Sequence, residues 1–330
     1  MIKSAVIGCG VVSVCHLDAV KASDMAELVA VCDIIEDRAK ATAKEYGCAY
    51  YTDYKEMISR EKLDCVHICL PHWLHAPVAV YCLENNVNVV LEKPIASSLE
   101  GGEAIVEAAK KSSANIAVCF QNRYNNVSLT LKKLIDDGKL GKLKGARGAV
   151  TWSKPRSYYL DSDWRGKWAT EGGGVLINQS IHTLDLMQWL MGGKVESVKG
   201  HASTDYHDYV EVEDTASINL TFEGGAHGIF YATTSYCENS PIFLEISGEK
   251  GIAEINGGNL TVRYADGTVE VANNDSTSPN GKDYWGNAHA SIISDFYKNL
   301  ENGPFWISPE EAMKTLRILK EVYRQSGLDQ

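Results

Sequence analysis

Apolar runs and amphipathic segments alternate along the first third of the chain. The runs are short and almost continuously apolar, whereas the segments between them repeat apolar residues at helical spacing. The expected strands are residues 4–10, 26–33, 64–71, 88–94 and 116–120. The expected helices are residues 12–22, 36–47, 76–85 and 98–112. Continuous apolar strands that alternate with helices are typical of a parallel sheet covered on both faces, so we predict a doubly wound α/β domain over residues 1–122.

The periodicity changes after residue 122. A helix near residues 126–137 is expected to end at Gly138, and beyond it apolar and polar residues alternate one by one. The clearest alternating stretch buries Ala216, Ile218, Leu220 and Phe222. This alternation is typical of strands with one buried face, and the Asp266-Gly267 pair predicts a hairpin turn. Helices near 288–301 and 308–325 close the chain.

These elements predict a second, α+β domain over residues 123–330, built on a large open antiparallel sheet. One face of this sheet is expected to pack on the domain's own helices. The other face is expected to be wet or to pair with another subunit. The C-terminal helix is the element that we expect to pack back on the first domain.

Composition and charge restrict the partners. The chain has 330 residues, 45% hydrophobic and 23% charged, with a net charge of −11, as in an ordinary soluble protein of two domains. The lack of a strong basic cluster argues against nucleic acid as a partner. No stretch approaches the roughly 18 apolar residues of a membrane span, and the N-terminal apolar run is too short for a secretory signal. We therefore expect a cytoplasmic protein.

The nine cysteines point to reduced thiols rather than disulfides. Several lie in apolar strand-like runs, namely Cys32, Cys65, Cys69 and Cys119. Buried, reduced side chains are the ordinary interpretation of this placement. The segment CVHIC has strand alternation and no second cysteine pair, so we predict no metal site.

A glycine turn follows the first expected strand and opens the first helix. Gly8 and Gly10 take the first two positions of the dinucleotide-binding pattern GxGxxG, and Ser13 takes the third. The first glycine allows a tight turn. The second lets the backbone, including Val11 and Val12, approach a pyrophosphate at the helix N-terminus.

Asp33 ends the second expected strand, roughly 20 residues beyond the glycines. A carboxylate at this place accepts hydrogen bonds from an adenosine ribose, although an acidic residue here also suits the N-cap of the next helix. The carboxylate would repel a 2′-phosphate, and no arginine follows at once, because Ile34 and Ile35 come next. We predict NAD rather than NADP as the cofactor, with Ile34 beside it.

Several motifs in a fixed order extend this pattern over nearly the whole chain. They are EKP (92–94), LPHWLHAPVA (70–79), FQNRYNN (120–126), GGGVLINQSIHTLDL (172–186), WGNAHASIISDFYKNL (285–300) and the tail from residue 307. With these motifs the chain resembles the glucose–fructose oxidoreductase / inositol dehydrogenase / rhizopine-catabolism (Gfo/Idh/MocA) family. The resemblance implies an N-terminal Rossmann domain and an α+β domain whose sheet forms homodimers or homotetramers. It also implies oxidation or reduction of a secondary alcohol on a sugar, cyclitol or nucleotide sugar.

Lys93 is the leading candidate for the base that removes the hydroxyl proton. It follows an apolar strand at the carboxyl edge of the sheet, where ligands bind in open α/β folds. Burial beside a cationic nicotinamide ring would favour the neutral amine. Glu92 is expected to place the nicotinamide ribose or Lys93, and the resemblance implies a cis bond before Pro94.

Asn178 and His182 are the candidates from the second domain. Residues four apart on a helix share a face, so we expect both side chains to point the same way, with Asp185 orienting His182 or facing the helix surface. An imidazole exchanges protons near neutral pH, although an ordinary core histidine is the alternative for His182. Many family members carry an aspartate at this asparagine's position. The asparagine cannot titrate, but it can bond a substrate hydroxyl, and its pairing with Gln179 resembles family branches that act at C3 of a pyranose.

The resemblance assigns further contacts. Expected at the cofactor are Leu70, Pro71, His72, His75, Arg123, Trp164 and Arg165. Expected at the substrate, beside Lys93, Asn178, Gln179 and His182, are Tyr124, Tyr158 and Trp285. Tyr236 and His289 line the pocket or simply pack, and His16 is expected to be structural. The predicted protein is an NAD-dependent oxidoreductase for a sugar-like alcohol; the alternatives are an inositol or polyol dehydrogenase and a non-catalytic NAD sensor.

Overall fold

The computed structural model describes residues 1–274 and 288–328. Within these residues the chain divides into two compact units. The first unit comprises residues 1–121 and 288–313, and the second comprises residues 122–274 and 314–328. A short 3₁₀ turn, η2 (Gln121–Tyr124), and the long helix α11 (Pro309–Gln325) each begin in the first unit and end in the second.

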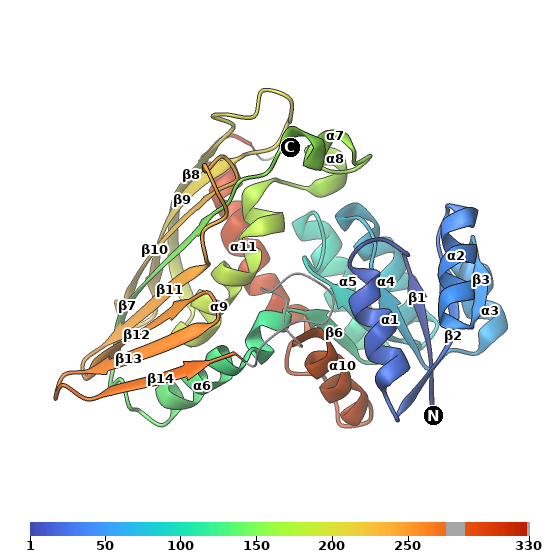
Figure 1. Cartoon of the computed structure of the whole chain (residues 1–330), viewed down its shortest axis with the longest axis horizontal. Helices are drawn as coiled ribbons and strands as arrows, with labels where there is room; N and C mark the ends of the chain where they lie inside the picture. The colour runs from blue at the N-terminus through green and yellow to red at the C-terminus, as the bar shows by residue number, and fades with distance from the viewer. Residues whose placement is uncertain (275–287, 329–330) are drawn as a thin grey trace. The chain divides into compact units, whose positions relative to one another are not determined.

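The first unit is built on a six-stranded parallel sheet (Figure 1). Its strands are β1 (Ile2–Ile7), β2 (Ala26–Cys32), β3 (Ala49–Tyr51), β4 (Cys65–Ile68), β5 (Asn88–Glu92) and β6 (Ile116–Cys119). The order β3-β2-β1-β4-β5-β6 confirms the predicted doubly wound sheet. The chain order reverses at β1, so the carboxyl ends of β1 and β4 border the place where ligands bind in such folds.

Helices cover this sheet, including those that the apolar pattern predicted over residues 12–22, 36–47, 76–85 and 98–112. They are α1 (Ser13–Ala22), α2 (Glu36–Tyr46), α3 (Tyr54–Glu61), the turn η1 (His72–Leu74), α4 (His75–Glu84), α5 (Leu99–Lys111) and, from the end of the chain, α10 (Ala288–Lys298). Gly47 ends α2 in the left-handed conformation. β3 and α3 were not predicted, because the three residues of β3 are mostly exposed and carry no apolar run. α10 packs on α1, so a segment far along the chain completes the first unit.

The second unit carries an eight-stranded sheet. Its strands are β7 (Leu143–Thr151), β8 (Val195–Ser203), β9 (Thr215–Phe222), β10 (His227–Thr233), β11 (Phe243–Gly248), β12 (Gly251–Asn256), β13 (Asn259–Tyr264) and β14 (Val269–Asn273). Their order is β14-β13-β12-β11-β7-β10-β9-β8, and every neighbouring pair is antiparallel except β7 and β10, which are parallel. The predicted antiparallel sheet is therefore confirmed with one parallel pair, and the β9 residues alternate between buried and accessible as expected.

Helices pack on one face of the eight-stranded sheet. The helical elements of this unit are α6 (Asn126–Asp136), α7 (Arg156–Leu160), α8 (Trp168–Glu171), the π-helical turn η3 (Val175–Gln179), α9 (Ile181–Met191) and the second part of α11. α9 is buried along most of its length and packs on β7 and β11. The opposite face exposes apolar residues such as Ile229 and Tyr231. Pairing of this face with another subunit stays a prediction.

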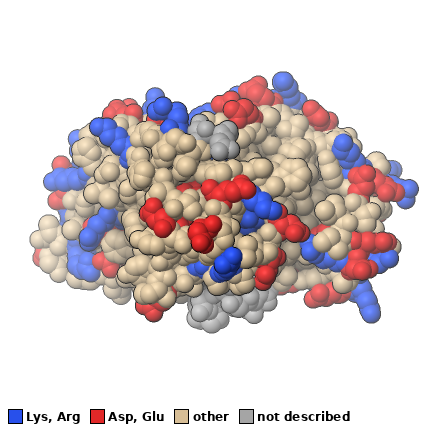
Figure 2. Space-filling model, turned by 90° about the horizontal axis from the view of Figure 1, so that it is seen from above, with Lys and Arg blue, Asp and Glu red and all other residues tan. Residues whose placement is uncertain are grey.

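Charged side chains of both signs are distributed over the surface seen in Figure 2. Figure 2 shows basic and acidic side chains interspersed over the described part of one face. Among the described residues, no helix is both long enough and apolar enough to cross a membrane.

Candidate active site

The glycine turn after β1 has the geometry that a dinucleotide requires. Gly8 has a φ of +92°, and a Cβ there would lie 2.3 Å from the carbonyl oxygen of Cys69. Only glycine fits this position. At Gly10 a Cβ would meet nothing within 4 Å, so the backbone is open to a ligand. The Ser13 hydroxyl donates to the Gly10 carbonyl at 2.6 Å and holds the turn against α1.

Asp33 follows β2 and lies beside this turn. Its carboxylate accepts hydrogen bonds from the backbone N–H groups of Cys9 and Ile35, both at 2.9 Å. Arg38, in the first turn of α2, also reaches it at 3.3 Å. No arginine follows Asp33 directly in the sequence, but α2 brings Arg38, five positions along the chain, back to this carboxylate. Ile34 is 86% exposed, so it is available to cover an adenine ring. These residues fit NAD.

Glu92 ends β5 as a buried carboxylate. Its Oε1 accepts hydrogen bonds from Nε2 of His16 at 2.9 Å and from Nε2 of His289 at 3.2 Å. Burial alone would raise the pKa of Glu92, but the two histidines outweigh it and hold that pKa well below its usual range. Glu92 is therefore an ionised anchor at the carboxyl edge of the sheet, directly before Lys93.

A line of hydrogen bonds continues from Glu92 through the first unit. Nδ1 of His16 lies 2.9 Å from Nδ1 of His67, whose Nε2 lies 2.6 Å from the hydroxyl of Tyr297. That hydroxyl lies 2.9 Å from the Ser4 hydroxyl. Burial lowers the pKa of both histidines and so favours their neutral rings, while the contact with Glu92 acts in the opposite direction on His16. His16 is fully buried within this line, and the structural role expected of it stays a prediction.

One cluster in the described residues has metal-binding composition. The ligand atoms of His16, Glu92 and Cys119 lie within 4.8 Å of one another. The hydrogen bond between the first two already accounts for their closeness. Burial and the charge of Glu92 raise the pKa of the Cys119 thiol well above its usual range, which disfavours the thiolate that would bind a metal.

Lys93 is half-buried just beyond β5, and its bond to Pro94 is cis, as expected. His75 lies beneath this segment, with Nδ1 2.7 Å from the Pro94 carbonyl and Nε2 2.8 Å from the Leu70 carbonyl. It therefore ties the end of β4 to the Lys93 segment. Burial lowers the pKa of His75, although the two carbonyl contacts favour a protonated ring. The neighbouring Pro71 is half-buried.

In the second unit, Asn178 and His182 do not share one regular helix, which corrects the prediction. Asn178 lies in the π-helical turn η3, and His182 lies in α9, with Ser180 between them. The Ser180 N–H donates to the carbonyl of Val175 at 2.9 Å, five residues back. Such a turn is frequent at functional sites because it redirects side chains that a helix would stack. Both side chains are half-buried.

Polar and aromatic side chains gather around Asn178. Its Nδ2 donates to Glu171 at 2.6 Å and to the Tyr158 hydroxyl at 3.3 Å. Gln179 donates to the same hydroxyl at 3.1 Å. The Arg165 guanidinium lies over the Tyr158 ring, 4.4 Å from its centroid. The structure thus brings Asn178, Gln179, Tyr158 and Arg165 together.

Two buried glutamates flank the glycine run and were not predicted. Burial raises the pKa of Glu171 and of Glu213 from 4.5 to about 7. Glu213 accepts hydrogen bonds from the N–H groups of Gly174 at 2.7 Å and Leu176 at 2.9 Å. Glutamate is usually exposed, and neither residue lies in a periodic apolar segment, so the sequence carries no clear signal of their burial.

Asp185 also differs from the expectation. It does not face the helix surface, because it forms a fully buried pair with Arg123, with two contacts of 2.7 Å. Its orienting of His182 stays a prediction. Thr315 adds a hydrogen bond at 3.0 Å. The cofactor role assigned to Arg123 stays a prediction.

The other predicted residues are distributed as follows. In the first unit, His72 is buried and Val11 is 69% exposed beside the glycine turn, while Val12 and Leu70 are half-buried. In the second unit, Tyr124 and Trp164 are half-buried, and Tyr236 is exposed. Trp285 lies outside the described residues.

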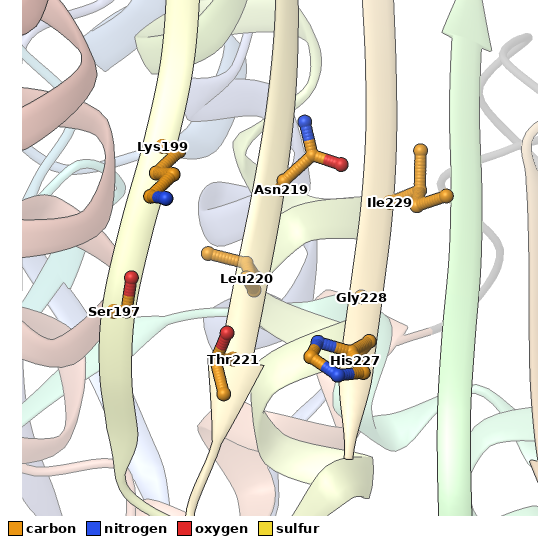
Figure 3. Close-up of a pocket in the computed structure, with 8 residues that line it drawn as sticks. All are labelled: Ser197, Lys199, Asn219, Leu220, Thr221, His227, Gly228 and Ile229. Carbon is orange, nitrogen blue, oxygen red and sulfur yellow. The ribbon is translucent and has the colours of Figure 1, made fainter. Parts of the chain in front are cut away.

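A shallow hollow of about 330 Å³ lies elsewhere in the second unit. Figure 3 shows that side chains of the adjacent strands β8, β9 and β10 line it. Lys199, Asn219 and His227 are its largest polar members. It contains none of the predicted site residues, so we do not assign the chemistry to it.

Family models match the two parts of the chain in succession. Residues 2–120 match an oxidoreductase family with an NAD-binding Rossmann fold, and residues 128–254 match the Gfo/Idh/MocA C-terminal domain. The chain belongs to the Gfo/Idh/MocA family of oxidoreductases. It is therefore an NAD-dependent oxidoreductase that acts on CH–OH groups, which confirms the predicted family, enzyme class and cofactor.

Solved structures and curated Gfo/Idh/MocA relatives are similar over most of their length. The WlbA dehydrogenase from Chromobacterium violaceum, crystallised with NADH and UDP-GlcNAcA, is 30% identical with a TM-score of 0.85, and the match covers 99% of this chain and 94% of that one. The WlbA dehydrogenase from Bordetella pertussis, with the same two ligands, is 28% identical with a TM-score of 0.85, covering 99% and 96%. The scyllo-inositol 2-dehydrogenase (NAD(+)) of Bacillus subtilis is 26% identical over 92% of this chain and 87% of the relative.

Proposed function

We propose that this oxidoreductase transfers hydride between NAD and a secondary hydroxyl of a sugar, glycoside or nucleotide sugar, at C3 of a pyranose ring. The observation that carries the proposal is the similarity to two WlbA dehydrogenases crystallised with NADH and UDP-GlcNAcA, which extends over 99% of the chain. The adjacent amides of Asn178 and Gln179, which meet at Tyr158, are consistent with a polar sugar as the ligand.

In the proposed reaction, Lys93 removes the hydroxyl proton while His182 assists by hydrogen bonding to the same oxygen. NAD supplies the hydride acceptor when bound. Two contacts hold the segment that carries Lys93: Glu92 is bonded to His16, and His75 is bonded to the Pro94 carbonyl.

Replacement of Lys93 tests the assignment. Lys93→Met keeps a long apolar stem but no base, so we expect NAD binding in calorimetry to persist and turnover to fall by roughly 10²–10⁴-fold. The matched control is Lys111→Met, at the exposed end of α5, which should keep wild-type turnover. Unchanged turnover in Lys93→Met would reject the assignment.

A cyclitol dehydrogenase is the second candidate. It is favoured by the similarity to the NAD(+)-dependent scyllo-inositol 2-dehydrogenase over 92% of the chain. Absorbance of NADH, followed with a panel of UDP-sugars, glycosides and inositols, separates the candidates. Turnover with inositols alone would replace the sugar assignment.

The alternative of a non-catalytic NAD sensor, raised because Asn178 cannot titrate, is disfavoured by the membership of the chain in an oxidoreductase family. Silence across the whole panel, with tight NAD binding intact, would favour the sensor. The presence of both Lys93 and His182 favours an enzyme.

A further inference from the structure

The amide of Asn178 has both of its N–H bonds engaged within the second unit. Nδ2 donates to Oε1 of Glu171 at 2.6 Å and to the hydroxyl oxygen of Tyr158 at 3.3 Å. A primary amide carries its two donors on nitrogen and its acceptors on oxygen. The oxygen Oδ1 of Asn178 therefore points away from both partners.

Glu171 enforces this orientation. It is fully buried at the end of α8, and its second oxygen accepts the backbone N–H of Gly166 at 2.5 Å. An ionised carboxylate can only accept hydrogen bonds. A reversed Asn178 amide would place two acceptor oxygens about 2.6 Å apart in a buried place, so the ionised Glu171 excludes it.

Tyr158 has the opposite polarity. Its oxygen accepts from the amides of both Asn178 and Gln179. Burial raises the pKa of Tyr158, so the phenol keeps its proton, which is directed away from the two amide donors. Oδ1 of Asn178 is therefore a hydrogen-bond acceptor, and the O–H of the neighbouring Tyr158 is a hydrogen-bond donor. A hydroxyl group, which both donates and accepts, complements this pair.

We infer that Glu171 is a positioning residue that makes Asn178 a hydrogen-bond acceptor for a donor group, either the substrate hydroxyl or an ammonium group. The inference rests on the proposed function, which places Asn178 at the reacting alcohol. It adds the polarity of that contact and the residue that sets it.

The groups that face Glu171 set the pH range over which the arrangement holds. Burial and the charge of Glu213 raise the pKa of Glu171 to about 7, while Arg165 and the hydrogen bonds from Gly166 and Asn178 lower it. Among the described residues, Tyr158, Tyr159 and Tyr323 also interact electrostatically with Glu171. Below this pKa a protonated Glu171 can donate, and it then no longer excludes the reversed amide.

A double-mutant cycle tests the inference. In Glu171→Gln, the Gly166 N–H holds the new carbonyl and leaves the new NH₂ facing Asn178, which reverses the Asn178 amide. We expect turnover to fall about tenfold or more, the effect of one misdirected hydrogen bond, with NAD affinity unchanged. The pH dependence that Glu171 contributes near pH 7 should also disappear.

The second substitution restores the polarity. Asn178→Asp alone places two carboxyl groups in contact, so we expect lower thermal stability and lower turnover. In the double variant, the glutamine introduced at position 171 donates to the new carboxylate at position 178. That carboxylate again presents an acceptor, and we expect turnover to recover to within about tenfold of wild type. The control is Glu211→Gln, which contacts Trp168 of the same helix but not Asn178 and should keep wild-type turnover.

The probes are UDP-GlcNAcA and scyllo-inositol, with NADH absorbance as the readout. A double variant no more active than Glu171→Gln would overturn the inference, as would a Glu171→Gln variant with wild-type turnover. Absence of wild-type turnover with every probe would instead reject the proposed function. In that case the ligand-free melting temperatures still decide the arrangement: destabilisation by Asn178→Asp that Glu171→Gln relieves supports it, and additive effects of the two substitutions overturn it.

Discussion

Glu213 makes the stability of this enzyme depend on pH in the opposite direction from an ordinary surface carboxylate. It is buried, and burial raises its pKa from 4.5 to about 7, although two backbone N–H groups and the Tyr323 hydroxyl donate to it. Between these two pH values the folded state binds the proton more tightly than the unfolded state does. Stability from this group is therefore fully present below pH 4.5 and is lost as the pH rises through 7.

The magnitude follows from the pKa difference. A rise from 4.5 to about 7 is about 2.5 units, and each unit corresponds to about 1.36 kcal/mol, so ionisation of Glu213 costs the folded state about 3 kcal/mol. Glu213→Gln removes the titration. The NH₂ group of the glutamine cannot accept the hydrogen bonds that the neighbouring groups donate to Glu213. This loss lowers the stability of the variant by an amount that does not change with pH.

Urea unfolding of wild type and Glu213→Gln at pH 5 and pH 8 provides the assay. We expect the wild-type free energy of unfolding, relative to the variant, to fall by about 2–3 kcal/mol between the two pH values. The exposed control Glu223→Gln should leave the wild-type pH dependence intact. A difference between wild type and Glu213→Gln that is the same at both pH values would refute the argument.

Two further predictions concern the cofactor and the glycine run. Asp33→Ser removes the acceptor of the ribose hydroxyls and leaves Arg38 beside the site. Calorimetry should therefore show that NAD affinity falls by about 10–100-fold and that NADP affinity rises. A wild-type preference for NADP would contradict this prediction. Gly173→Ala places a Cβ 2.2 Å from the Tyr323 hydroxyl, so unfolding measurements should show a loss of about 2–4 kcal/mol, against about 1 kcal/mol for Gly192→Ala, where a Cβ meets nothing within 4 Å.

Local patterns predicted most of the architecture. The buried strands of the first unit are continuous apolar runs, which predict strands covered on both faces. In β9 apolar and polar residues alternate strictly, which predicts a strand and identifies its buried face. β7 and β8 were not singled out because residues such as Gly145, Gly148 and Gly200 interrupt their alternation. There the glycines serve close packing against other elements: a Cβ at Gly200 would meet Val322 of α11 at 2.8 Å.

The candidate site was harder to predict because its partners are distant in sequence or geometrically irregular. Helical spacing linked Asn178 to His182, but the π-helical turn changes that relation. Asp185 was expected to orient His182 or to face the helix surface, but it is buried in a pair with Arg123, 62 residues earlier. Glu171 is seven residues from Asn178, yet only the folded turn brings them into contact. Periodicity reports burial along one element and is silent about which side chains meet across elements.

The placement of α10 has a consequence for biosynthesis. His289 and Tyr297 lie on this helix, where His289 bonds to Glu92 and Tyr297 bonds to His67. The rest of the first unit consists mainly of residues 1–121, far earlier in the chain. The ribosome must synthesise the chain beyond residue 297 before these bonds form. Until α10 has been synthesised, Glu92 and His67 lack these two partners, so folding of the nucleotide-binding unit is coupled to synthesis of the second unit instead of preceding it.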